Sequence, residues 1–212
     1  MLNFLRDELK GISIFLRGNG REAVVISSAI LFIVLDRYHP VWNDPASHLL
    51  YYIALPILVI IVLLRKNPLD FGLRPGNVKV WGFYVAVTCL IAAPLLYFSA
   101  SIPSLRSYYK AENFDFVRYF LTYCAVLSAS EFLFRGFLLF GLKDRLKEAS
   151  ILVQMVPFVL IHFGKPEVET LSTVVTGIYF GYVAYRGNAF WPVFIIHLFI
   201  NVFFVSVVNL LP

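Results

Sequence analysis

A carboxylate and a guanidinium lie deep inside one of the most apolar stretches of the sequence. Glu131 and Arg135 are four residues apart within the run 116–142, so they fall on one face of a helix. On insertion scales a charge at the centre of a bilayer costs at least ~2.5 kcal/mol, and such residues mark functional sites or buried ion pairs. Two interpretations follow: the residues take part in chemistry, or they form a structural pair that joins two helices.

Three further polar side chains lie in later apolar runs. His162 lies in a short run, and His197 and Asn201 share one helix face in the last run. With a cytoplasmic N-terminus and a rise of about 1.5 Å per residue, Glu131, His162 and His197 lie about 16, 18 and 11 Å from the cytoplasmic ends of their helices. A lone membrane histidine is more often a packing residue, but the similar depths predict that these side chains converge.

These residue types suffice for hydrolysis without a covalent nucleophile. Glu131 and His162 could share a water molecule and remove its proton as it attacks a peptide carbonyl. His197 and Asn201 could donate hydrogen bonds to the developing oxyanion. One glutamate and two histidines could instead ligate zinc, although the sequence has no HExxH motif. We therefore favour a site without metal or other cofactor and keep zinc as the alternative.

The composition is that of an integral membrane protein. Of 212 residues, 59% are hydrophobic and only 15% are charged, whereas about a quarter of the residues of a soluble domain are charged. The mean hydropathy is +0.77. The net charge of +5 comes from basic residues spread over the connecting loops, which argues against a nucleic-acid partner. Cys89 and Cys124 each lie alone in an apolar run and indicate neither a disulfide framework nor a metal site.

The apolar runs predict an all-α, polytopic membrane protein with about seven transmembrane helices. Their lengths suit helices rather than the short alternating strands of a barrel. We expect residues 21–212 to form a single transmembrane domain. The predicted spans are 23–35, 49–64, 80–100, 116–142, 151–163, 168–185 and 190–211.

An amphipathic helix precedes the first predicted span. In residues 1–17, leucine and isoleucine recur at steps of three and four, with basic residues between them. This pattern predicts a helix that lies in the membrane interface, within a segment of residues 1–20. Gly18-Asn19-Gly20 is expected to break it before the first span.

The distribution of lysine and arginine over the loops predicts a cytoplasmic N-terminus. Twelve basic residues fall on the side of the N-terminus and five on the other side, and the more basic side of a membrane protein faces the cytoplasm. The five are Arg37, Arg106, Lys110, Arg118 and Lys165. We expect a multi-pass protein of a bacterial cytoplasmic membrane with its C-terminus outside.

The polar motifs resemble those of the CAAX prenyl-protease and bacteriocin-processing family, also called the Abi family. The resemblance covers about residues 70–205, with the protease-like core at about 116–205. It implies a metal-independent intramembrane glutamate protease in which a glutamate and the first histidine activate water. The second histidine and the asparagine would then form the oxyanion hole. The motifs that carry it are Phe71-Gly72-Leu73-Arg74, Glu131-xxx-Arg135-Gly136, Phe158-xxx-His162 and His197-xxx-Asn201.

One position departs from the family pattern. The first motif of the family usually begins with two adjacent glutamates, but Ser130 occupies the first position here and Glu131 the second. We expect Glu131 to act as the base, with Glu169 as a supporting carboxylate. Glu167 and Glu169 could equally be solvated residues at a helix start. The segment 162–169 resembles a single-glutamate bacterial subgroup with an HFGKPxxE sequence, which implies trimming of C-terminal membrane-sorting tails.

The sequence therefore predicts an intramembrane endopeptidase that cleaves a membrane-anchored protein or peptide in or near the lipid bilayer. Ser130 keeps a second interpretation open, an inactive pseudoprotease that binds a membrane peptide as an immunity or assembly factor. A transporter or proton relay would also use intramembrane glutamate and histidine. The chain shows no two-half symmetry to support that third interpretation.

Overall fold

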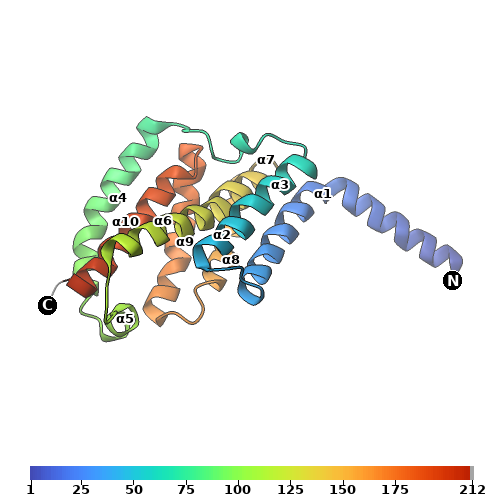
Figure 1. The fold of residues 1–212 in the computed structure, drawn as a ribbon. Coiled ribbons are helices and arrows are strands. Elements are labelled where there is room, and N and C mark those ends of the chain that lie inside the picture. Colours follow the sequence, from blue (N-terminus) through green and yellow to red (C-terminus); the bar gives the residue numbers. More distant parts are fainter. Residues whose placement is uncertain (211–212) are drawn as a thin grey trace.

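The computed structural model describes residues 1–210, except for the side chains of residues 2–3 and 15–17. The described chain is all-α and contains no strand, as the sequence predicted; a single isolated bridge joins Phe163 and Lys165. The helices form one bundle, from which the start of α1 projects (Figure 1). They are α1 (Leu2–Tyr38), α2 (Asp44–Leu49), η1 (Leu50–Ala54), α3 (Leu55–Val62), η2 (Pro68–Asp70), α4 (Val78–Ser99), α5 (Pro103–Tyr109), α6 (Phe116–Glu131), η3 (Phe132–Leu138), α7 (Leu139–Leu146), α8 (Ala149–Leu160), α9 (Glu167–Gly187) and α10 (Trp191–Leu210).

Helical segments occupy all seven of the predicted spans. Five described segments are long and apolar enough to cross a bilayer, which confirms a polytopic membrane protein. The other two are α8, which has only 12 residues, and α9. The five candidate spans are Gly18–Tyr38, Asp44–Val62, Val78–Ser99, Phe116–Leu146 and Trp191–Leu210.

The predicted break between the N-terminal helix and the first span is wrong. Helix α1 continues through Gly18, Asn19 and Gly20, although Figure 1 shows that the helix bends where it leaves the bundle. A glycine in a helix interior costs only about 1 kcal/mol of helix stability relative to alanine. The helix-forming residues on both sides of Gly18-Asn19-Gly20 therefore keep this segment helical. Phe4, Leu9 and other apolar side chains of the projecting part are exposed.

The segment from α6 to α7 is the central helix of the bundle. It runs without interruption from Phe116 to Leu146, and 83% of its most apolar window is buried. Its middle part, η3, is a π-helix that begins directly after Glu131. Single π-helical turns occur frequently at functional sites, because the wider turn changes the direction of the side chains that follow it. This turn was not predicted from the sequence.

The loop between α3 and α4 closes the bundle beside η3. Phe71 is buried and stacks on Phe137, and the Gly72 carbonyl accepts a hydrogen bond from the Phe190 amide. A Cβ atom on Gly136 would lie 3.0 Å from the Phe71 carbonyl oxygen. Glycine at this position therefore allows the loop to approach the helix that carries Glu131.

Helices α8 and α9 pack closely through small residues. A Cβ atom on Gly177 would lie 2.9 Å from the side chain of Met155. Gln154 is buried and donates a hydrogen bond of 2.9 Å to the Gly177 carbonyl. Close contact of this kind fixes α8, and with it the position of His162, against the rest of the bundle.

Candidate active site

Glu131 is the centre of a buried charged group. Its side chain is fully buried, and both of its polar partners reach the same oxygen. Oε1 lies 2.6 Å from His197 Nδ1 and accepts a hydrogen bond of 3.1 Å from Arg135 Nη1, which also lies 2.9 Å from Oε2. The structure therefore brings together three residues from two helices. Glu131 is hydrogen-bonded to Arg135 and His197, whereas no bond joins it to His162 within the described residues.

Arg135 is held by one carboxylate and by aromatic rings. Its guanidinium lies 4.0 Å from the ring centroid of Phe158 and 5.3 Å from that of Phe180. Nε and one terminal nitrogen have no hydrogen-bond partner in the described residues. Cation–π attraction is worth about 2 kcal/mol or more in a desolvated site and partly replaces those missing bonds. Arg135 therefore fixes the orientation of Glu131 from the interior of the bundle.

His162 lies in the turn after α8, not inside a helix as the sequence predicted. Helix α8 ends at Leu160, three residues after Pro157. The Nδ1 atom of His162 lies 2.7 Å from the Phe158 carbonyl oxygen. Since a carbonyl can only accept, Nδ1 carries the proton, and Nε2 of the neutral ring is an acceptor. The Thr170 hydroxyl donates a hydrogen bond of 3.0 Å to the His162 carbonyl and holds the turn in place.

His162 and His197 pack against the same aromatic ring. The Phe158 centroid is 4.7 Å from that of His162 and 6.1 Å from that of His197. The next polar residue on α10 is Asn201, whose Oδ1 accepts a hydrogen bond of 2.8 Å from the Tyr119 hydroxyl. The predicted convergence of polar groups from separate helices is therefore present in the structure.

A cavity of about 650 Å³ lies in front of these groups. Ser130, His162, His197 and Asn201 line it, whereas Glu131 does not. The Ser130 hydroxyl donates to the Val126 carbonyl at 2.9 Å. Imidazole and amide groups therefore reach the cavity, and the buried carboxylate reaches it through His197.

The cavity also contains polar residues that sequence reasoning missed. Both oxygens of Asp36 accept hydrogen bonds, from Ser47 at 2.6 Å and from Tyr52 at 2.9 Å. The sequence placed Asp36 in a loop after the first span, and no motif marked it. The remaining charged or titratable residues of the lining are Arg37, Asp44, His48, Tyr123 and Lys165.

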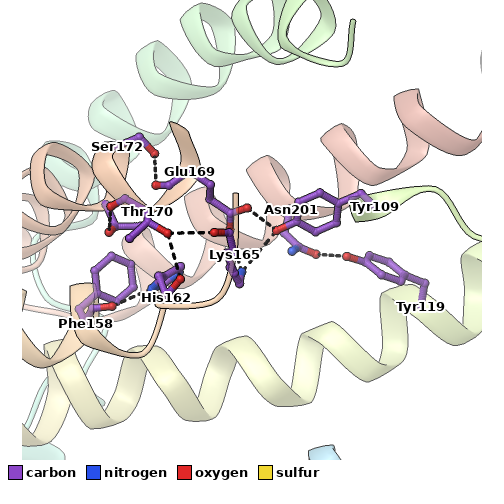
Figure 2. A network of polar contacts seen from close by, with 10 residues as sticks. Tyr109, Tyr119, Phe158, His162, Lys165, Glu169, Thr170, Ser172 and Asn201 are labelled. Atoms are coloured by element: carbon purple, nitrogen blue, oxygen red, sulfur yellow. Dashed lines mark hydrogen bonds and ion pairs between the residues drawn. The ribbon is translucent and has the colours of Figure 1, made fainter. Parts of the chain in front are cut away.

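Glu169 belongs to a network beside the cavity rather than to the cavity itself. Its carboxylate lies 2.7 Å from Lys165 Nζ and accepts a hydrogen bond of 2.7 Å from the Tyr109 hydroxyl (Figure 2). Burial and the charge of Glu169 raise the pKa of Tyr109, so this phenol remains a donor. Glu169 therefore holds Lys165 at the cavity and ties α5 to α9. Glu167 is exposed.

The zinc alternative has no preformed ligand set. Within residues 1–210 there is no group of three or more His, Cys, Asp or Glu side chains placed to hold a metal ion. Glu131 and His197 lie together, but the Nδ1 atom of His162 is bonded to a backbone carbonyl.

A comparison with family models identifies the core of the chain. Residues 112–203 match the model described as type II CAAX prenyl endopeptidase Rce1-like. Over this segment the chain is similar to the CAAX protease family. The match confirms the resemblance drawn from the motifs and points to a protease, a hydrolase. Comparisons with curated proteins and with solved structures gave no significant match.

Proposed function

We propose that this CAAX protease-type chain is an intramembrane endopeptidase that uses Glu131, His162, His197 and Asn201. The observation that carries the proposal is the 2.6 Å contact between Glu131 Oε1 and His197 Nδ1. It joins a fully buried carboxylate to an imidazole that lines the cavity, together with His162 and Asn201. A carboxylate that is hydrogen-bonded to one nitrogen of an imidazole fixes the tautomer of the imidazole and stabilises the charged form of the ring.

In this proposal His162 receives the proton of the attacking water. Its Nδ1–H is bonded to the Phe158 carbonyl, so Nε2 can accept a hydrogen bond from water in the cavity. As water attacks the peptide carbonyl carbon, one of its protons moves to Nε2 of His162. That proton then passes to the leaving amine when the carbon–nitrogen bond breaks.

His197 and Asn201 stabilise the oxyanion that forms at the same time. In this proposal the Nε2–H of His197 donates to the carbonyl oxygen as it gains charge, while Nδ1 stays bonded to Glu131. Asn201 contributes an amide N–H from one turn further along α10. Removing one such donor typically lowers the rate by about 10²–10³-fold. In this proposal Glu131 acts through His197. The sequence alone had predicted that Glu131 and His162 together remove the proton of the attacking water.

The walls of the cavity support a membrane-anchored protein or peptide as substrate. Apolar residues of α1 and α8 line one part, among them Ile30, Ile33 and Leu160. Asp36 lies in the last turn of α1 and Lys165 in the loop between α8 and α9, and both line another part. This combination suits an extended peptide at the end of a hydrophobic segment, such as a C-terminal membrane-sorting tail. The proposed location is the cytoplasmic membrane of a bacterium, with the N-terminus in the cytoplasm.

A library of membrane-anchored reporters tests the function. Each member carries a folded reporter, a randomised segment of about eight residues and an apolar tail of about 20 residues, long enough to span a bilayer. A farnesylated peptide that ends in Cys-a-a-X is tested in parallel, because the matched family is named for such substrates. Purified wild-type protein in proteoliposomes should release a subset of reporters or the tripeptide. The His197→Ala variant should release neither.

A second candidate function is binding without cleavage. Ser130 lines the cavity at the position where the family usually has its first glutamate, which favours this alternative. If wild-type protein cleaves no reporter and no farnesylated peptide but retains a subset of tails, the endopeptidase proposal is wrong. Equal release by wild type and His197→Ala would also contradict it, because the cleavage would then come from a contaminant.

A further inference from the structure

We infer that Tyr119 is a positioning residue that directs the amide of Asn201 into the cavity. The inference rests on the proposed function, in which Asn201 donates to the oxyanion. Tyr119 lies in the first turn of α6 and Asn201 in the middle of α10, 82 positions apart in the sequence. Figure 2 shows the Tyr119 hydroxyl pointing at the Asn201 side chain.

The direction of the hydrogen bond decides which end of the amide reaches a substrate. The Tyr119 hydroxyl donates to Asn201 Oδ1 at 2.8 Å. An asparagine side chain has one acceptor oxygen and one NH₂ donor on opposite sides of the same carbon. With Oδ1 held by the phenol, Nδ2 is turned away from Tyr119. Asn201 lines the cavity, and its Nδ2 has no hydrogen-bond partner within residues 1–210, so the donor is available to the oxyanion.

The hydroxyl of Tyr119 reaches the candidate site through Asn201. It is half-buried and does not line the cavity, whereas Tyr123, one turn further along α6, does. The rings of Tyr119 and Tyr123 stack with centroids 4.3 Å apart, which fixes the position of the Tyr119 hydroxyl. Without that hydroxyl the amide can rotate and present Oδ1 to the carbonyl oxygen of the substrate. Two acceptors would then face each other, which opposes the formation of the oxyanion.

A double-mutant cycle on the full chain tests the inference, with a cleaved reporter from the tail library as substrate. Tyr119→Phe keeps the ring and its stacking but removes the hydroxyl. We expect kcat to fall about tenfold, equivalent to about 1.4 kcal/mol, with KM unchanged. In an Asn201→Ala background the same change should alter kcat less than twofold, because the group that it positions is absent.

Tyr179→Phe is the matched control. Tyr179 lies on α9, its hydroxyl is bonded to Thr88, and it does not line the cavity. This variant also loses a side-chain hydrogen bond and should keep kcat within twofold of wild type. A tenfold loss from Tyr119→Phe that persists in the Asn201→Ala background would overturn the inference, since Tyr119 would then only support the fold.

The outcomes also separate this inference from the proposed function. If Asn201→Ala lowers kcat by about 10²–10³-fold while Tyr119→Phe matches the control, the oxyanion role stands and the positioning role is wrong. If Asn201→Ala keeps the full rate, the oxyanion role itself fails, and the role of Tyr119 fails with it.

Discussion

His197 Nδ1 lies 2.6 Å from Glu131 Oε1, across 66 positions of sequence. The contact joins the central helix to α10 at the wall of the cavity. Arg135 Nη1 donates to the same Oε1 at 3.1 Å and lies 2.9 Å from Oε2, so one buried anion contacts both a cation and an imidazole. In the proposed mechanism Glu131 supports His197, and His162 is left free to accept a proton.

The first prediction concerns the stability of the buried charges. Arg135→Met should lower the free energy of unfolding by about 3–5 kcal/mol, because it leaves the carboxylate of Glu131 buried without its cation. The double variant Glu131→Gln with Arg135→Met should recover much of that loss, since the buried carboxylate and the guanidinium are then both absent. Thermal unfolding in detergent measures both. Equal stability of the single and double variants would show that the pair contributes no coupling.

The second prediction concerns Ser130. Its hydroxyl is bonded to the Val126 carbonyl of its own helix, so Ser130→Ala should keep most of the cleavage activity. Ser130→Glu places a new carboxylate at the cavity wall. Wild-type protein should cleave the reporter without that carboxylate. Initial rates of reporter release test both variants. Cleavage by Ser130→Glu but not by wild type would identify the natural protein as a binder.

The third prediction concerns metal. Rates of cleavage should be unchanged after dialysis of the protein against a strong chelator, because in the proposed mechanism His162, His197 and Asn201 supply the base and the donors. Loss of activity that added Zn²⁺ restores would replace this mechanism with attack by metal-bound hydroxide. A zinc-dependent protease treated in the same way serves as the positive control.

The fourth prediction concerns topology. A fluorescent reporter that matures only in the cytoplasm should be dark when fused after Pro212 and bright when fused before Met1, as the distribution of basic residues indicates. The bright N-terminal fusion controls for expression. A bright C-terminal fusion would reverse the orientation or change the number of spans.

Much of the fold could be predicted because membrane helices leave a local signal. Long apolar runs predicted a helix in each of the seven spans, and the polar interruptions marked Glu131, His162, His197 and Asn201 as candidate site residues. The break at Gly18-Asn19-Gly20 failed because local propensity is weak compared with the continuity of a long helix.

The pairing of the site residues could not be read from the sequence in the same way. Similar depth placed Glu131, His162 and His197 at one level, but depth does not tell which side chains touch. The bond from Glu131 to His197 depends on how helices pack around the central segment. Tyr119 and Asp36 carried no signal, since tyrosines and charged residues are common at the ends of membrane spans.

We propose that Glu131 drives cleavage through His197, and the Glu131→Gln variant tests this role. Glutamine can still accept the hydrogen bond of His197 but cannot stabilise its charged form. The measurement is kcat for a cleaved reporter, on folded protein, for wild type, Glu131→Gln, and Glu131→Gln with Arg135→Met. We expect both variants to lose at least about 10²-fold in kcat, even where the double variant is as stable as wild type. Wild-type kcat in the stable double variant would contradict the claim and leave Glu131 and Arg135 as a structural pair.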